Sequence, residues 1–381
     1  MSVLTSMHAD DALLADAEPR PAKRPRLDFL DAAKGIGILA VMALHSSGRS
    51  SRTLLTQNSA EWWIDVGFNR LMAFAVPMFL CVSAFLWAFG AASKPGIAAG
   101  TIRRLSTILY PYLIWTALYL LWQAFVEGTP IANMSSGKAL YNDLVWGKGY
   151  FHLYFLSVLL QAAILFPLML WMARRTGFLA CCAGSIIIQA LVFVAQSKLH
   201  FLPFPGSSVL WYVTSLLPAA WLGAHWPVSP PSLRKLLMVS LTLGLPSTAA
   251  YLWLEVLDVD GLRRFGVLLN PVQQLFVFSA GLAVISWLAL RKPVASKGWS
   301  WLCWIGASSL PFYLLHPMVM RFLSGPRITQ VLQRIPIGPL WSYGALLAGT
   351  FVAVWVLNKI RAEKLLFGRS TPALPKNLDK A

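Results

Sequence analysis

The sequence predicts an all-α fold: a polytopic membrane bundle of about ten transmembrane helices, with both termini on the cytoplasmic side. Three observations lead to this prediction. Hydrophobic residues make up 57% of the 381 residues and charged residues only 12%, which is too apolar for a soluble fold with a polar surface. Apolar segments long enough to cross a bilayer recur along the chain. Lysine and arginine are also divided unevenly between the segments that join them.

Ten segments have the length and apolar character of a membrane span. They cover residues 31–48, 66–90, 106–126, 151–172, 177–196, 207–224, 236–254, 266–290, 300–321 and 338–358. An even number of spans places both ends of the chain on one side. With the N-terminus inside, 20 of the 32 lysines and arginines fall in inner segments and 11 in outer ones. This distribution predicts the N-in, C-in orientation.

The spans predict one domain between two short tails. Residues 1–25 are acidic and then rich in Pro, Arg and Lys, so we expect a disordered cytoplasmic tail and not a signal peptide. Residues 26–360 form the expected transmembrane domain, and residues 361–381 a disordered, cytoplasmic C-terminal tail. Basic residues beside the spans explain most of the net charge of +17, which indicates contact with anionic lipid and not with nucleic acid. The four cysteines lack metal-ligand spacing, so no metal site is expected.

The first span carries the strongest candidate site. Lys34 and His45 are eleven residues apart, so they share one helix face and lie about 16 Å apart along the axis. His45 would then lie about two-thirds of the way through a ~30 Å hydrocarbon core. An ionisable side chain at that depth is costly unless it faces a cavity or a partner. Asp31 precedes Lys34 by one turn and could hold it in an i,i+3 ion pair.

Two further places carry chemistry-bearing side chains, one just before a predicted span and one at the start of another. Arg103 and Arg104 precede the third span at its inner end, where they could grip phosphate groups or simply anchor the helix at the membrane surface. His152 opens the fourth span among aromatic residues near the outer surface. Packing and a site role both remain open for this histidine.

The ninth predicted span also contains polar residues. Ser309, Tyr313 and His316 lie towards the outer half of the bilayer, where polar groups are costly unless they line a polar interior. His316 is thus a second imidazole at a depth similar to that of His45.

Several motifs, taken in order, resemble those of a known family. They are Leu30-Asp31-Ala-Ala-Lys34-Gly35-Ile36, the eleven-residue step from Lys34 to His45, Pro77-Met-Phe-Leu-Cys-Val-Ser83, His152-Leu-Tyr-Phe-Leu156 and Ser309-Leu-Pro-Phe-Tyr313-Leu-Leu-His316-Pro317. In this order they resemble the integral-membrane acyltransferase 3 family, most of all its fucose-4-O-acetylase and exopolysaccharide O-acetylase branch. The resemblance covers nearly the whole chain.

The resemblance implies a membrane O-acyltransferase of the bacterial inner membrane. Such an enzyme moves an acetyl group, or another acyl group, from cytoplasmic acetyl-CoA to a hydroxyl of an extracytoplasmic glycan, such as an exopolysaccharide or a lipid-linked oligosaccharide. Acetyl-CoA is then a donor substrate, and no cofactor is bound permanently. The implied partners are the lipid bilayer, the acyl-CoA donor, the glycan acceptor and a polysaccharide assembly machinery.

The resemblance also implies roles for individual residues. His45 matches the family's essential histidine, and an imidazole, which titrates near neutral pH, suits the general base that activates a hydroxyl. Lys34 matches the family's basic residue, with Asp31 holding it. Lys34, Arg103 and Arg104 would bind the anionic donor. The expected acceptor-binding residues are His152, Ser309, Tyr313 and His316.

This chain departs from the family pattern beside the third span. An Arg-x-x-Arg motif would need a basic residue at Ser106 or Thr107, and neither position has one. The contacts to the donor phosphates therefore stay open at this point.

Two other functions are alternatives: a polytopic carrier or flippase, and a non-catalytic partner in polysaccharide export. A carrier is expected to show inverted repeats and helices broken near the midplane. The sequence shows no internal repeat, which favours the acyltransferase.

Overall fold

The computed structural model describes residues 27–91, 97–226, 232–259, 266–291, 296–372 and 374. Within these ranges the chain is helical and contains no β-strand, so the predicted all-α class is confirmed. The expected N-terminal tail, residues 1–25, lies outside the described residues.

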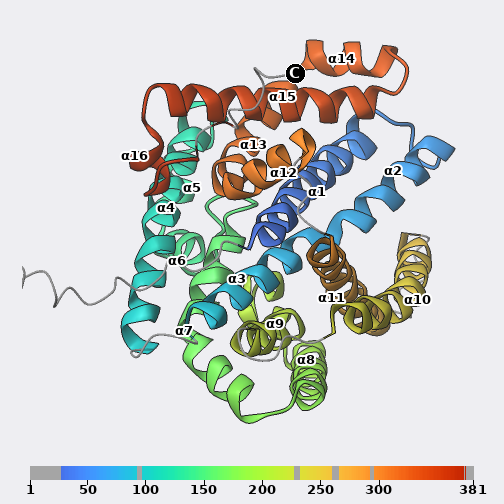
Figure 1. The fold of residues 1–381 in the computed structure, drawn as a ribbon. Helices are drawn as coiled ribbons and strands as arrows, with labels where there is room; N and C mark the ends of the chain where they lie inside the picture. Colours follow the sequence, from blue (N-terminus) through green and yellow to red (C-terminus); the bar gives the residue numbers. More distant parts are fainter. Residues whose placement is uncertain are drawn as a thin grey trace, which may run out of the picture.

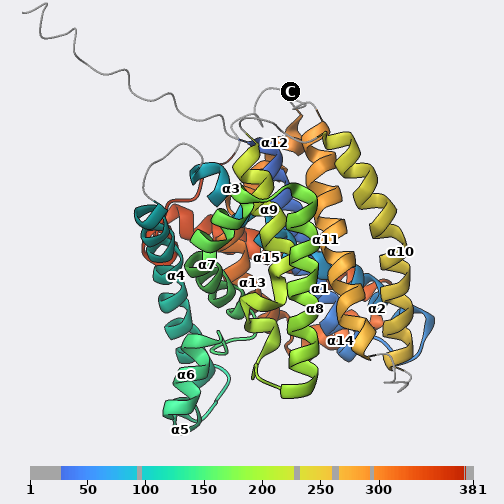
Figure 2. The same ribbon diagram turned by 90° about the horizontal axis from the view of Figure 1, so that it is seen from below.

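The first half of the fold contains α1 (Asp28–Thr53), α2 (Ala60–Leu71), η1 (Met72–Phe74), α3 (Ala75–Ala91), α4 (Ile97–Phe125), α5 (Ile131–Met134), α6 (Gly137–Val145), α7 (Tyr154–Arg175) and α8 (Phe178–Leu199). The second half contains η2 (Pro205–Ser207), η3 (Val209–Tyr212), α9 (Val213–His225), α10 (Leu233–Val259), α11 (Gly266–Leu290), α12 (Lys297–Ala307), α13 (Ser309–Leu323), α14 (Pro326–Arg334), α15 (Gly338–Lys359) and α16 (Glu363–Phe367). Helices α4 and α10 stand at opposite edges of the bundle (Figures 1 and 2).

Eight helices of the described chain are long and apolar enough to cross a membrane, and the pair α12 and α13 makes a ninth when counted as one span. The chain is a multi-pass membrane protein. Residues 207–224, expected as one span, instead form short 3-10 turns followed by α9, a helix of only 13 residues. The count of ten and the N-in, C-in orientation stay predictions.

Helix α1 lies at the centre of the bundle and packs against α2, α3, α11, α12, α13 and α15 (Figure 1). Its crossing with α12 depends on two glycines. A Cβ added to Gly306 would stand 1.7 Å from the carbonyl oxygen of Asp31, and one added to Gly35 would stand 2.3 Å from that of Leu302. Small residues at such crossings let two membrane helices approach closely. The crossing therefore fixes α12 against the end of α1 that carries Asp31 and Lys34.

The C-terminal segment corrects one expectation. The tail after Arg361 is not disordered from its start, because α16 packs against α4. Phe367 is buried and its ring stacks on that of Trp115, with centroids 5.7 Å apart. The Trp115 indole N–H donates to the Leu366 carbonyl over 2.8 Å, and the Trp304 indole N–H donates to the Pro372 carbonyl over 3.0 Å. An apolar ring and indole donors thus hold a segment whose composition alone indicates disorder.

Candidate active site

The central helix brings His45 to a cavity. The imidazole is half-buried and lines a space of about 230 Å³ between α1, the start of α3, η3, α7 and α11. The polar groups that share this lining are Tyr154, Tyr212, Gln273 and Gln274. The location predicted for His45, deep in an apolar helix, is therefore one where its ring reaches an open space and not only packed side chains.

Three imidazoles from distant parts of the chain meet here. The His45 ring stacks on that of His316, with centroids 5.3 Å apart, and makes an edge contact with the Phe151 ring, whose centroid lies 4.9 Å away. His152 lies 5.8 Å from His316, ring to ring. Helix α1, the turn before α7 and helix α13 thus bring their histidines into one cluster.

One hydrogen bond in the cluster shows which nitrogen of the His316 ring carries the proton. The Nδ1 atom of His316 lies 2.8 Å from the Tyr313 carbonyl oxygen, which can only accept, so Nδ1 carries the proton. Within the described chain, Nε2 of His316 and both ring nitrogens of the fully buried His152 make no hydrogen bond. Buried polar atoms are usually paired in folded proteins, so this concentration of unpaired nitrogens is typical of a functional site.

A sharp bend places the ring of His316. Helices α12 and α13 meet at an angle of 78° around Ser308, and the Tyr313 hydroxyl then donates to the carbonyl of His152. Of the residues expected to bind the acceptor, His152, Tyr313 and His316 gather beside His45. Ser309 is buried at the start of α13 and does not line the His45 cavity.

The opposite end of α1 carries the basic residues. Lys34 Nζ lies 2.6 Å from an Asp31 carboxylate oxygen, and both side chains are partly exposed. Arg369, just after α16, lies close enough to this carboxylate for the charge of Asp31 to act on its guanidinium. The sequence did not point to Arg369 because this residue lies in a segment expected to be disordered.

The two consecutive arginines of α4 do not act as a pair. Arg103 is exposed, and its guanidinium is available to an anion. Arg104 turns inward, where it donates to the Trp87 carbonyl over 2.9 Å and lies 4.6 Å from the centre of the Phe166 ring. The structure therefore gives Arg104 a packing contact and leaves Arg103 as the candidate phosphate ligand.

Arg49 is a site neighbour that the sequence reasoning missed. It follows His45 by one turn of α1 and is only 6% exposed. Its guanidinium donates to the Leu323 carbonyl over 2.9 Å, to Thr329 Oγ1 over 3.0 Å and to Ser342 Oγ over 3.1 Å. Arg49 thus ties α1 to the end of α13 and to α14 and α15. Its i,i+4 spacing from His45, which places both side chains on one face of the helix, was the signal that could have found it.

Replacing Arg49 with methionine is expected to destabilise the fold. The Leu323 carbonyl would lose its side-chain donor, so the free energy of unfolding should fall by about 1–3 kcal/mol. Thermal unfolding of the purified protein in detergent measures this effect. Arg52→Met, which changes an exposed arginine of the same helix, is the matched control. Equal unfolding temperatures for the two variants would show that the buried contacts of Arg49 contribute little.

Comparison with protein family models matches residues 27–359 to the acyltransferase domain of acyltransferase 3. The chain belongs to the acyltransferase 3 family. Comparison with curated proteins gives no match, and neither does comparison with solved structures. The range matched to the acyltransferase 3 domain runs from the residue before α1 to the end of α15, so it contains Lys34 and the histidine cluster, whereas α16 and Arg369 follow it.

Proposed function

We propose that this acyltransferase moves an acetyl group from cytoplasmic acetyl-CoA to a hydroxyl of an extracytoplasmic glycan, with His45 as the general base. The observation that carries the proposal is the position of His45: its imidazole lines a cavity inside an apolar bundle and is stacked against a second imidazole. Membership of an acyltransferase family supports the reaction class.

The proposed reaction begins at the acceptor hydroxyl, a weak nucleophile until a base removes its proton. His45 takes this proton as the hydroxyl oxygen attacks the thioester carbonyl. The tetrahedral intermediate then expels the CoA sulfur, which accepts the proton from His45, so the base returns to its neutral form. Stacking by His316 and the edge contact from Phe151 hold the His45 ring in one orientation. These two residues are positioning residues.

Basic side chains at the far end of α1 suit the anionic donor. Lys34, Arg369 and the exposed Arg103 lie at the expected cytoplasmic end, where the phosphates of CoA could bind. Lys34 and His45 are about 16 Å apart along α1, a span that an extended pantetheine arm would have to cover. Arg369 could supply the basic group that Ser106 and Thr107 do not.

The test uses purified protein in lipid nanodiscs with acetyl-CoA labelled in the acetyl group and a glycan acceptor. An ester-linked label on the glycan supports the proposal. The 78° bend between α12 and α13 is a feature that carriers also show, so a second arm omits the donor and measures glycan transport into liposomes. Transport without donor, together with no ester formation, would contradict the proposed reaction.

Removing the exposed arginine is expected to weaken donor binding. Arg103→Ala should raise the Kd for acetyl-CoA about tenfold, since a hydrogen bond to a charged group contributes about 1.5 kcal/mol. Isothermal titration calorimetry with the purified protein measures this constant. Arg175→Ala, which changes another exposed arginine, is the control. If Arg103→Ala binds the donor as tightly as the control does, Arg103 serves only as a membrane-surface anchor.

A further inference from the structure

An apolar groove of about 440 Å³ runs between α8, α10 and α11. Side chains on its rim are open to the outside of the bundle: Ile186 and Val239 are each 56% exposed, and Leu243 is 47% exposed. Because these helices are long and apolar enough to cross a membrane, their outer faces contact lipid. The groove therefore opens sideways into the hydrocarbon.

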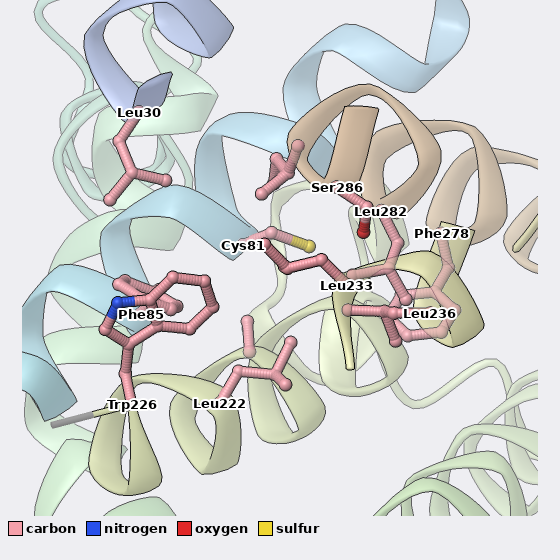
Figure 3. A pocket seen from close by; sticks show the side chains of 12 residues that line it. Leu30, Cys81, Phe85, Leu222, Trp226, Leu233, Leu236, Phe278, Leu282 and Ser286 are labelled. Atoms are coloured by element: carbon pink, nitrogen blue, oxygen red, sulfur yellow. The ribbon is translucent and has the colours of Figure 1, made fainter. Parts of the chain in front are cut away.

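One end of the groove narrows towards α1. Leu236, Phe278 and Leu282 also line a smaller cavity of about 20 Å³, which Leu30 and Trp226 share (Figure 3). A cavity of that size holds little more than one water-sized group. An apolar chain in the groove would therefore end here.

The other part of the groove lies next to the His45 cavity, because one residue lines both. Gln274 lines both spaces, is only 6% exposed, and its Oε1 atom makes no hydrogen bond within the described chain. The hydroxyl of Thr214, which also lines the groove, is equally unpaired there. A buried amide or hydroxyl without a partner costs about 1–3 kcal/mol. A ligand that offers hydroxyl groups at this junction would remove that cost.

The absence of charged side chains from the described lining of the two spaces limits the chemistry of the ligand. The residues that line the groove and the His45 cavity include no lysine, arginine, aspartate or glutamate. A phosphate group in this apolar region would be desolvated without a countercharge, which is strongly unfavourable. The part of the ligand between its apolar chain and its reacting hydroxyl must therefore be uncharged.

We propose that the groove binds the apolar chain of a membrane-resident acceptor, an amphiphile whose uncharged, hydroxyl-bearing head passes Gln274 and presents its hydroxyl to His45. The sideways opening is the reason to assign the chain to the acceptor, because the nucleotide donor is water-soluble and would enter from the expected cytoplasmic end. This inference rests on the proposed function and names its acceptor class.

The test uses alkyl glucosides with the full-length protein in phosphatidylcholine nanodiscs. The ratio kcat/KM for acetyl transfer is expected to be at least tenfold higher for dodecyl glucoside than for methyl glucoside. A dodecyl glucoside with a diazirine at the chain end should label peptides of α8, α10 and α11 on illumination. Unlabelled dodecyl glucoside, but not methyl glucoside, should compete for this labelling.

Two tryptophan substitutions on α8 separate groove binding from general effects. Ala190 lines the groove, whereas Ala180 does not, and both alanines are exposed. Ala190→Trp should reduce labelling and raise the KM for dodecyl glucoside about tenfold, with no change for methyl glucoside. Ala180→Trp should change neither constant. Equal effects of Ala190→Trp on both acceptors would overturn the inference.

The two experiments distinguish a failure of the groove inference from a failure of the proposed function. Saturable labelling of the groove without acetyl transfer would support the groove and overturn the proposed function. Transfer that does not depend on chain length, with labelling that no competitor reduces, would overturn the groove and leave the proposed function in place. Labelling spread over all outward-facing helices would show that the groove contacts bulk lipid only, and it would overturn the inference as well.

Discussion

Replacing His45 with glutamine is expected to lower kcat for acetyl transfer at least about 100-fold, the lower range of what a general base contributes. Of the clustered imidazoles, His45 is the one that lines the cavity. His152 and His316 are fully buried behind it. Glutamine preserves hydrogen bonding and approximate size but cannot accept the acceptor's proton at neutral pH. The KM for acetyl-CoA should change little, because the basic residues lie at the other end of α1.

The assay follows transfer of labelled acetyl in nanodiscs, with unfolding temperature and acetyl-CoA binding measured on the same samples. His225→Gln is the matched control, since His225 stacks on Trp221 of α9 outside the cluster. We expect both variants to remain folded and to bind the donor, and only His45→Gln to be inactive. Wild-type turnover by His45→Gln would overturn the central assignment.

Replacing Gly306 with leucine is expected to prevent assembly of the bundle. The Cβ atom would stand 1.7 Å from the Asp31 carbonyl oxygen and 2.7 Å from the Gly35 nitrogen, and both are backbone atoms that cannot rotate away. Helices α1 and α12 would have to separate, which moves the turn that holds Asp31 and Lys34. Overpacking commonly costs about 1–3 kcal/mol, and a backbone collision exceeds that range.

Fluorescence-detected size-exclusion chromatography of detergent extracts measures the folded yield of this variant. Gly298→Leu is the control on the same helix, because a Cβ at Gly298 has no neighbour within 4 Å. The milder Gly306→Ala, which adds only the Cβ, should fold in part and unfold at a lower temperature than wild type. Normal yield and stability of Gly306→Leu would show that α12 does not pack as described.

The fold class could be predicted because the lengths of the apolar segments can be read directly from the sequence. The same reasoning also placed Asp31 next to Lys34, since i,i+3 spacing on one helix needs no tertiary information. It could not foresee the 78° bend at Ser308 or the break before α9, because both segments are apolar overall and only their turn residues interrupt them.

The depth of the candidate site residues in the membrane could be predicted from the sequence, but the directions in which their side chains point could not. Spacing along the spans gave His45 and His316 a similar depth, yet which face of each helix meets the other depends on crossing geometry. The inward turn of Arg104 and the proximity of Arg369 to the charge of Asp31 depend in the same way on partners distant in sequence. Their functional roles, like that of His45, stay predictions until the variants are assayed.

The docking of α16 affects how the protein is made. The indole N–H of Trp115 donates to the carbonyl of Leu366, which lies 251 positions further along the chain. During synthesis α4 therefore leaves the ribosome long before α16 does. Until then the side chain of Trp115 lacks this acceptor, so a chain that ends before α16 leaves the indole N–H without its partner from Leu366.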